Sequence, residues 1–429
     1  MRSFSAPFDG SFPSAGLTLS AGMLYGVNGG GGQSNFGTIF KVGTNGTGCS
    51  VIHHFVGGSD GEYPVGRVVV SGNTIYGVMY RGGTNNVPEG GGTIYKVDTD
   101  GSNYSILRRL NSAINDGYKP ASGMVLSGNF LYGTTTQGGV SSRGTSDRGT
   151  VFKINANGSG YQIIHAFSGY EDGLQPEAEL TLIGNTLYGT AVFSQFGSSG
   201  PVLFKLGLDG SVFTVLYTFP VTLSVLGGNG IGHLTLVGNQ FYGVGRYYQN
   251  NANLSSVFKI HTNGTVFQII RQLVSELGIS GSLTWTGYEL LAPLTADSGT
   301  FDQIFQVKTN GTGFQILKTF SPSEPNTLVN VFALSGTTAY GVSLHGGQFN
   351  VGTVYSFDVS PKLDIASTGG GVKLTWPSYA QDYQLEQSLT LTSPSWTNVT
   401  DVPSDNGTNR TLTLPALISA NAMFHRLRR

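Results

Sequence analysis

The sequence predicts an all-β protein, a seven-bladed β-propeller followed by a small β-sandwich, and three observations predict this fold. A unit of about 50 residues recurs along the chain, in the range of propellers and solenoids. Each unit contains four short apolar segments separated by turn residues, as in one four-stranded blade. The final unit is two strands short, and matching strands begin the chain. The string LYG or a close relative marks the units at Tyr25, Tyr76, Tyr132, Tyr188, Tyr242 and Tyr340, and Leu291 replaces tyrosine in a degenerate copy.

Composition supports many short strands and excludes several functional classes. The 429 residues include 65 glycines, interleaved with apolar residues rather than gathered in low-complexity stretches. Only 11% of residues are charged and the net charge is -1, so we expect no nucleic-acid partner. The single cysteine, Cys49, excludes an internal disulfide and a cysteine zinc site, and we expect a small buried thiol.

Targeting signals are also informative. No apolar segment is long enough to cross a membrane, so we expect no membrane insertion. The first ten residues lack the apolar core of a signal peptide. The low charge and the abundance of Gly, Ser, Thr and Asn are typical of exported bacterial surface proteins. We therefore expect an extracellular or cell-surface protein whose signal peptide has been removed.

Each unit is predicted to follow the same order of strands. A first strand such as residues 185–191 is followed by a glycine-rich loop and a second strand such as residues 149–154. An Asn-Gly or Asp-Gly turn, as at Asn157-Gly158, then leads into a third strand such as residues 161–167. A fourth strand such as residues 179–182 completes the unit. If the first strand is innermost, its tyrosines form a ring around the axis, and the following glycines allow close approach of neighbouring blades.

The two ends of the repeat array predict how the ring closes. The seventh unit begins near Ser335 and stops at Pro361, without a third and fourth strand. Residues 2–8 match a third strand and residues 16–19 match a fourth, so N-terminal strands would complete the last blade and remove the exposed edge. The propeller is thus assigned to residues 1–360. Residues 361–429 are predicted to form a β-sandwich with Trp376 and Trp396 in its core.

The repeat pattern of YGT or YGV, GG, GTVFKI, an NG turn and DGxxP resembles the GloVer tandem repeat of exported bacterial proteins, which are described as choice-of-anchor proteins. The resemblance covers residues 1–360, and the remainder resembles fibronectin type III or immunoglobulin-like modules beside such repeats. The resemblance to the repeat implies an exported propeller, and it does not imply a particular activity. The DGxxP motif is lost in units four to six, and no Pro-Glu-Pro sorting tail is present.

The regular polar motifs are interpreted as scaffold. Four aspartates at equivalent positions suit a hard cation such as calcium, but each lies in a different blade, whereas a calcium site needs several oxygens together. We therefore expect Asp-Gly turns and no cofactor, with calcium as the alternative. The motifs are Asp9–Pro13, Asp60–Pro64, Asp116–Pro120 and Asp172–Pro176. One position of the third strand carries His53, Arg108, His165, Tyr217, Arg271 and Lys318, which we interpret as half-exposed outer residues.

Candidate binding residues lie where the first strands end and the long, variable loops begin. Sequence change without functional constraint in the loops could by itself explain why these residues differ between units. The functional interpretation is a polar and aromatic pocket for a neutral or anionic sugar, in which the tyrosines stack on the sugar and the polar residues form hydrogen bonds with it. The candidates are Tyr80, Arg81, Gln137, Arg246, Tyr247 and His345.

Three functions remain open from the sequence. The first is a binding or scaffold module for a glycan or protein. The second is a carbohydrate-active enzyme of the polysaccharide lyase or glycosidase type, with His345 or Tyr247 as base and Arg81 or Arg246 neutralising charge. Asp297 stands alone at the mouth, whereas glycoside hydrolysis usually needs two carboxylates. The third is a self-associating subunit of a surface layer or filament.

Overall fold

The computed structural model divides into two compact units, Met1–Phe357 and Asp358–Arg429. All regular elements in the described part of the chain are β-strands, and no helix in it could cross a membrane. The structure describes residues 2–428 except 84–89, 112–115, 142–143, 145–146, 193–199, 221–232, 250–251, 275–276, 280–281, 297–301, 322–323, 325, 370, 378–379, 381–382, 390–394, 407–408 and 416–422.

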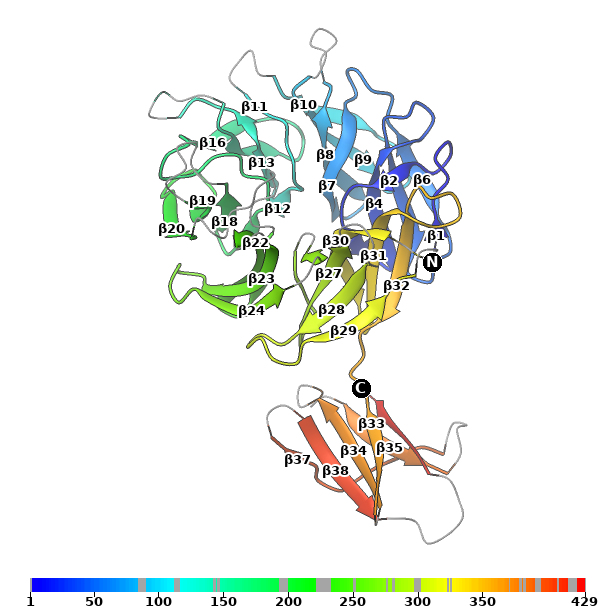
Figure 1. Ribbon diagram of the computed structural model, residues 1–429. Coiled ribbons are helices and arrows are strands. Elements are labelled where there is room, and N and C mark those ends of the chain that lie inside the picture. The colour runs from blue at the N-terminus through cyan, green and yellow to red at the C-terminus, as the bar shows by residue number, and fades with distance from the viewer. Residues whose placement is uncertain are drawn as a thin grey trace. The chain divides into compact units, whose positions relative to one another are not determined.

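The first unit is a succession of antiparallel sheets, in each of which strands near in sequence pair with one another. Figure 1 shows these sheets following one another around a common centre. The first four sheets contain β2 (Ser11–Pro13), β3 (Thr18–Ser20), β4 (Met23–Gly30), β5 (Thr38–Gly43) and β6 (Ser50–His54); β7 (Glu62–Ser71), β8 (Thr74–Arg81), β9 (Thr93–Asp98) and β10 (Ser105–Arg109); β12 (Val125–Ser127), β13 (Phe130–Thr135), β15 (Thr150–Asn155) and β16 (Gln162–Ala166); and β17 (Thr181–Ile183), β18 (Thr186–Ala191), β19 (Val202–Gly207) and β20 (Thr214–Thr218).

The later sheets repeat this order, and a two-stranded sheet of β11 (Gly117–Tyr118) and β14 (Gln137–Gly138) accompanies the third. They contain β21 (Thr235–Val237), β22 (Gln240–Gln249), β23 (Ala252–His261) and β24 (Gln268–Val274); β25 (Leu277–Ile279), β26 (Thr284–Trp285), β27 (Leu290–Ala296), β28 (Gln303–Val307) and β29 (Gln315–Thr319); and β30 (Asn326–Ser335), β31 (Thr338–His345), β32 (Thr353–Asp358) and β1 (Arg2–Ser3).

The strand predicted to come fourth in each unit is instead the first strand of the following sheet. β17 pairs with β18, with Thr181 opposite Tyr188, and not with β16. A tight turn at Gly184, with φ of 57°, makes this pairing local, which favours it over pairing across a long loop. The LYG strand is therefore second in its sheet, so the condition on which the ring of tyrosines around the axis depended, an innermost LYG strand, is not met. In Figure 1, β7, β12 and β30 lie toward the middle and β20, β24 and β29 lie outside.

The glycine after each LYG tyrosine makes room inside its own sheet rather than between blades. Gly133 lies directly opposite Phe152 on the neighbouring strand. A Cβ atom added at Gly133 would lie 2.6 Å from Cζ of the Phe152 ring, far closer than van der Waals contact. Phe152 is fully buried. The paired YG and VFK motifs thus fill the core of this sheet, because the Phe152 ring covers the backbone of Gly133.

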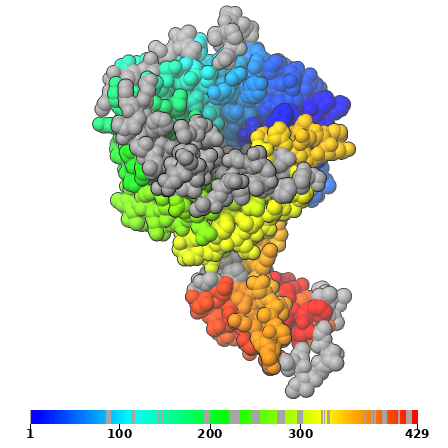
Figure 2. Space-filling view, viewed as in Figure 1, coloured from blue at the N-terminus to red at the C-terminus, as the bar shows by residue number. Residues whose placement is uncertain are grey.

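The two ends of the first unit meet in one sheet. β1 pairs with β32, with Arg2 opposite Val354 and Ser3 opposite Thr353. Figure 2 shows the N-terminal segment in dark blue beside the yellow and orange end of this unit. The predicted use of residues 16–19 in this sheet was wrong, because β3 pairs with β4 through the same tight turn found in the other sheets.

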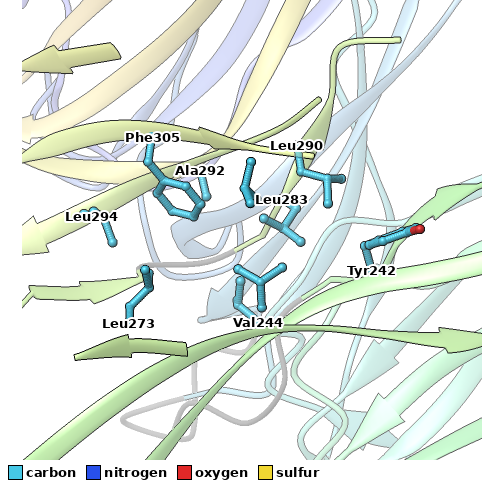
Figure 3. Packing of buried hydrophobic residues seen from close by; sticks show 10 residues of the cluster. Tyr242, Val244, Leu273, Leu283, Leu290, Ala292, Leu294 and Phe305 are labelled. Carbon is cyan, nitrogen blue, oxygen red and sulfur yellow. The ribbon is translucent and has the colours of Figure 1, made fainter. Parts of the chain in front are cut away.

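Successive sheets pack through apolar side chains and a repeated hydrogen bond. Figure 3 shows the buried residues between the sheet of β22 and that of β27, where Val244, Leu283 and Phe305 meet. Next to this layer, the Thr235 hydroxyl donates to the carbonyl of Leu283, 2.5 Å away, in the next sheet. The equivalent Thr18 and Thr181 hydroxyls donate to the carbonyls of Val68 and Leu234 at 2.6 and 3.2 Å. The first strands are thereby joined from sheet to sheet.

The second unit contains a four-stranded and a three-stranded sheet. Trp376 is buried in its core, whereas Trp396 is partly exposed beneath the Arg426 guanidinium, 4.2 Å from the ring centroid. The prediction that Trp396 fills the core was therefore wrong, because its ring serves as a platform for a charged group. The sheets contain β33 (Asp364–Thr368), β34 (Gly371–Pro377), β38 (Asn409–Pro415) and β37 (Ser404–Asp405), and β36 (Thr397–Asn398), β35 (Gln384–Ser388) and β39 (Phe424–Arg428).

Candidate functional site

The aspartates of the DGxxP motifs bind the polar residues of the third strands. Arg108 donates to both carboxylate oxygens of Asp116, at 2.8 and 2.7 Å. Arg2 donates to Asp9 at 2.9 Å, and His165 Nε2 lies 3.4 Å from Asp172. The two motifs that the sequence treated separately are thus partners, which sequence reasoning missed because they are separated by a loop.

Two of these pairs are completed by an aromatic side chain from the following sheet. The Arg108 guanidinium lies 4.4 Å from the ring centroid of Tyr161, and the His165 ring stacks on Phe213 at 3.6 Å. We call this arrangement a latch: a DGxxP aspartate, the third-strand residue bound to it, and an aromatic ring from the next sheet. Because the latch aspartates are engaged in this way, they act as scaffold. Among the described residues, no group of three or more His, Cys, Asp or Glu side chains could hold a metal ion.

One latch shows how the carboxylate is kept ionised. Burial would raise the pKa of Asp60, but the His53 imidazole, with Nε2 3.7 Å from the carboxylate, and hydrogen bonds from the Tyr104 hydroxyl and the backbone N–H of Val56 outweigh this effect and hold the pKa below its ordinary value. The His53 ring also stacks on Tyr104 with centroids 3.8 Å apart. The latch therefore presents no free carboxylate at neutral pH.

The residue before each DGxxP proline adopts an unusual backbone conformation. Its φ is positive, a region that favours glycine and that costs other residues about 1 kcal/mol or more. None of these residues is glycine, so their side chains are retained despite the strain. Two are exposed aromatic residues, Phe12 and Tyr63, at 42% and 50% exposure. The φ values are 57° at Phe12, 57° at Tyr63, 56° at Lys119, 47° at Gln175 and, at the related position in β30, 55° at Thr327.

These residues stand beside the ends of the LYG strands, where the sequence placed the binding site. Backbone pairs bring Ser11 opposite Gly30, Glu62 opposite Arg81 and Tyr118 opposite Gln137. We call this end of the sheets, made of the DGxxP segments and the last residues of β4, β8, β14 and β31, the long-loop face.

The predicted site residues divide between different sheets of this face. Tyr80 and Arg81 come together, since the Arg81 guanidinium lies 5.7 Å from the ring centroids of both Tyr80 and Tyr63. His345 lies elsewhere on the face, edge-on to the Phe12 ring with centroids 5.5 Å apart. Gln137 belongs to the β11–β14 pair of a third sheet.

The remaining predicted residues are only partly covered by the structure. Arg246 and Tyr247 belong to β22, opposite Ser255 and Leu254, and their side chains lie outside the described residues. Asp297 and much of the long loops, including residues 84–89, also lie outside them. The expected closeness of His345 or Tyr247 to Arg81 or Arg246 is therefore addressed only for His345 and Arg81, which belong to different sheets.

A second polar group consists of Arg67 of β7, Glu179 just before β17 and His233 just before β21, and no sequence motif pointed to it. Arg67 of β7 donates to both oxygens of Glu179, at 3.1 and 3.0 Å, and His233 Nδ1 lies 3.1 Å from the carbonyl oxygen of Glu179. Arg67 reaches Glu179 past Gly123, where an added Cβ would lie 2.6 Å from the Arg67 carbonyl. Burial lowers the pKa of His233, so its ring is neutral at pH 7. The group links three sheets, and the charges of Arg67 and Glu179 are paired.

The repeat unit matches a known family. Residues 1–191 and 87–301 match the model of the Gloeobacter/Verrucomicrobia repeat. The two matches overlap and together span residues 1–301, more than half of the 429-residue chain. No curated protein matches the sequence.

Several solved structures share the fold. The GH74 xyloglucanase from Xanthomonas campestris is similar with a TM-score of 0.53 and 10% identity, over 87% of this chain and 59% of that chain. A puromycin-hydrolysing peptidase of Mycobacterium tuberculosis has a TM-score of 0.52 and 11% identity, over 86% and 61% of the two chains. An oligogalacturonate lyase from Vibrio parahaemolyticus has a TM-score of 0.52 and 12% identity, over 82% and 90%. The chain spans roughly three fifths of the first two proteins, and at such identities the likeness shows a propeller-like all-β fold alone.

Proposed function

The chain belongs to the Gloeobacter/Verrucomicrobia repeat family, and from this premise we propose that it is a closed seven-bladed propeller whose long-loop face binds a glycan. The pairing of β1 with β32 and the threonine bonds between successive first strands support a closed ring. An extracellular or cell-surface location, inferred from composition, is part of the proposal. The second unit serves in it as a fibronectin-like spacer or second contact.

The observation that carries the proposal is the exposure of Phe12 and Tyr63 on this face. Phe12 and Tyr63 both have a positive φ, which glycine would adopt without strain. Their aromatic rings are exposed to water even though this backbone conformation is strained for a residue with a side chain. Unburied aromatic rings beside polar groups suit the apolar face of a sugar ring, whose hydroxyl groups the polar neighbours can bind. The neighbours here are Arg81 and His345.

A glycan array probed with the full chain tests this function. We expect binding to a subset of saccharides that is lost, by about tenfold or more in affinity, in Phe12→Gly and Tyr63→Gly. Glycine suits the positive φ at both positions, so these variants remove the rings while relieving backbone strain.

Val212→Gly is the matched control. Val212 also has a positive φ, 54°, and is 73% exposed, but it lies in the turn between β19 and β20, at the opposite end of its sheet. The control should bind as the unchanged protein does. Absence of binding to every saccharide, or equal losses in all three variants, would contradict a glycan site on the long-loop face.

A further inference from the structure

We propose that the ligand of the long-loop face is a uronic-acid saccharide and that Arg81 selects its carboxylate. This inference rests on the proposed glycan function and makes it more specific. It depends on three properties of Arg81: the absence of an acidic partner, its position between two tyrosine rings, and a backbone that holds one of these rings in place.

Arg81 has no acidic partner in the described part of the chain. Three other arginines of the first unit are paired: Arg2 with Asp9, Arg67 with Glu179 and Arg108 with Asp116, at 2.9, 3.0 and 2.7 Å. Glu62 stands directly opposite Arg81 in the sheet, yet no ion pair joins the two side chains. A half-buried guanidinium without a carboxylate is an anion-binding group, and its planar shape matches a carboxylate.

One donor of this side chain is also left unsatisfied. The Nε atom of Arg81 is buried and has no hydrogen-bond acceptor. A buried donor without a partner costs about 1–3 kcal/mol. A ligand that accepted a hydrogen bond from this atom would remove the cost, but the same atom is unsatisfied in Arg2 and Arg108, which are ion-paired, so the absence of a carboxylate partner is what distinguishes Arg81.

Two tyrosine rings flank the guanidinium. Tyr63 and Tyr80 both lie 5.7 Å from it, measured from Cζ to each ring centroid. Tyr63 lies in β7, is half exposed and has a positive φ of 57°. A pyranose ring stacked on Tyr63 would place a substituent carboxylate at C5 within reach of Arg81. The same geometry offers a neutral sugar only the stacking contribution.

A matched pair of polymers tests the inference: polygalacturonic acid and its fully methyl-esterified form, which share every sugar ring and differ in charge. By isothermal titration at low salt, we expect the acid to bind about tenfold more tightly than the ester. Arg81→Gln should abolish this ratio, and Arg81→Lys should retain part of it. Arg109→Gln, which alters an exposed arginine whose hydrogen-bond partner among the described residues is the Ser59 carbonyl, should leave the ratio unchanged. Circular dichroism verifies that each variant is folded.

Equal affinity of the unchanged protein for acid and ester, or binding to neutral saccharides alone, would overturn the acidic ligand while leaving the glycan function in place. Failure to bind any saccharide on the array would overturn both. A ratio that survives Arg81→Gln would overturn the assignment to Arg81.

Discussion

At the scale of single residues, Glu289 illustrates how burial changes a side chain's chemistry. Glu289 immediately precedes β27, and the residue is only 4% exposed. Burial raises the pKa of Glu289 from 4.5 to about 7, although Lys308 acts in the opposite direction. The folded protein therefore binds this proton more tightly than the unfolded chain. Stability should fall as the pH rises from about 4.5, and the loss should be complete above about 7.

Glu289→Gln should accordingly stabilise the protein in a pH-dependent manner. At pH 8 we expect a gain on the order of 2 kcal/mol in the free energy of unfolding, because the neutral amide needs no desolvation of charge. At pH 5 the gain should be much smaller. Thermal melts at the two pH values measure the difference, with the exposed Asp401→Asn as control. Equal gains at both pH values would contradict a titration of Glu289 in this range.

At the scale of elements, the latches explain how the outer edges of neighbouring sheets are held together. Asp116 is only 6% exposed, and its charge is balanced by Arg108, which in turn lies over Tyr161 of the next sheet. Removing the arginine would leave a buried carboxylate without its partner. Such unpaired buried charges are strongly destabilising.

Arg108→Ala should therefore lower the free energy of unfolding by about 3 kcal/mol. Arg109→Ala is the matched control, since this adjacent arginine is exposed and, within the part of the chain that the structure describes, hydrogen-bonds the Ser59 carbonyl. The loss of stability in this variant should stay within about 0.5 kcal/mol. Urea denaturation of both variants measures the contrast. Similar losses in the two would show that the latch contributes little.

At the scale of the whole molecule, the two ends of the first unit share one apolar cluster. Phe4 is fully buried and packs edge-on against Phe40, with centroids 4.8 Å apart. The same cluster contains Tyr340 and Val354 from the last sheet of the unit. Joining the ends in this way would close the ring and remove the exposed edge of β32.

Phe4→Ala should destabilise the first unit by about 3–5 kcal/mol, because it opens a cavity where the first and last sheets meet. Phe8→Ala, four residues later and 73% exposed, should cost less than about 0.5 kcal/mol. Calorimetry of the full chain separates this transition from that of the second unit. Unchanged melting of Phe4→Ala would contradict closure by the N-terminal segment.

Much of the fold could be predicted from the sequence because its signals are local. Apolar segments, the YG and VFK motifs and the NG turns fix strands and tight hairpins through neighbouring residues, as the pairing of β15 with β16 across the Asn157-Gly158 turn illustrates. The face on which Tyr80 and Arg81 meet could also be predicted, since strand ends and long loops gather on one side of such sheets.

The sequence alone determined the repeat, the turns and the outer position of the third strands. Only the tertiary structure decided which sheet the ELTL-type strands join, how the latch aspartates are used, and that Arg67 meets Glu179, 112 residues away. It also decided that Tyr63, an unremarked residue before a proline, stands exposed beside Arg81. The reason is physical: propensities and periodicity act over a few residues, whereas pairing of charges and exposure of rings depend on where distant backbones come to lie.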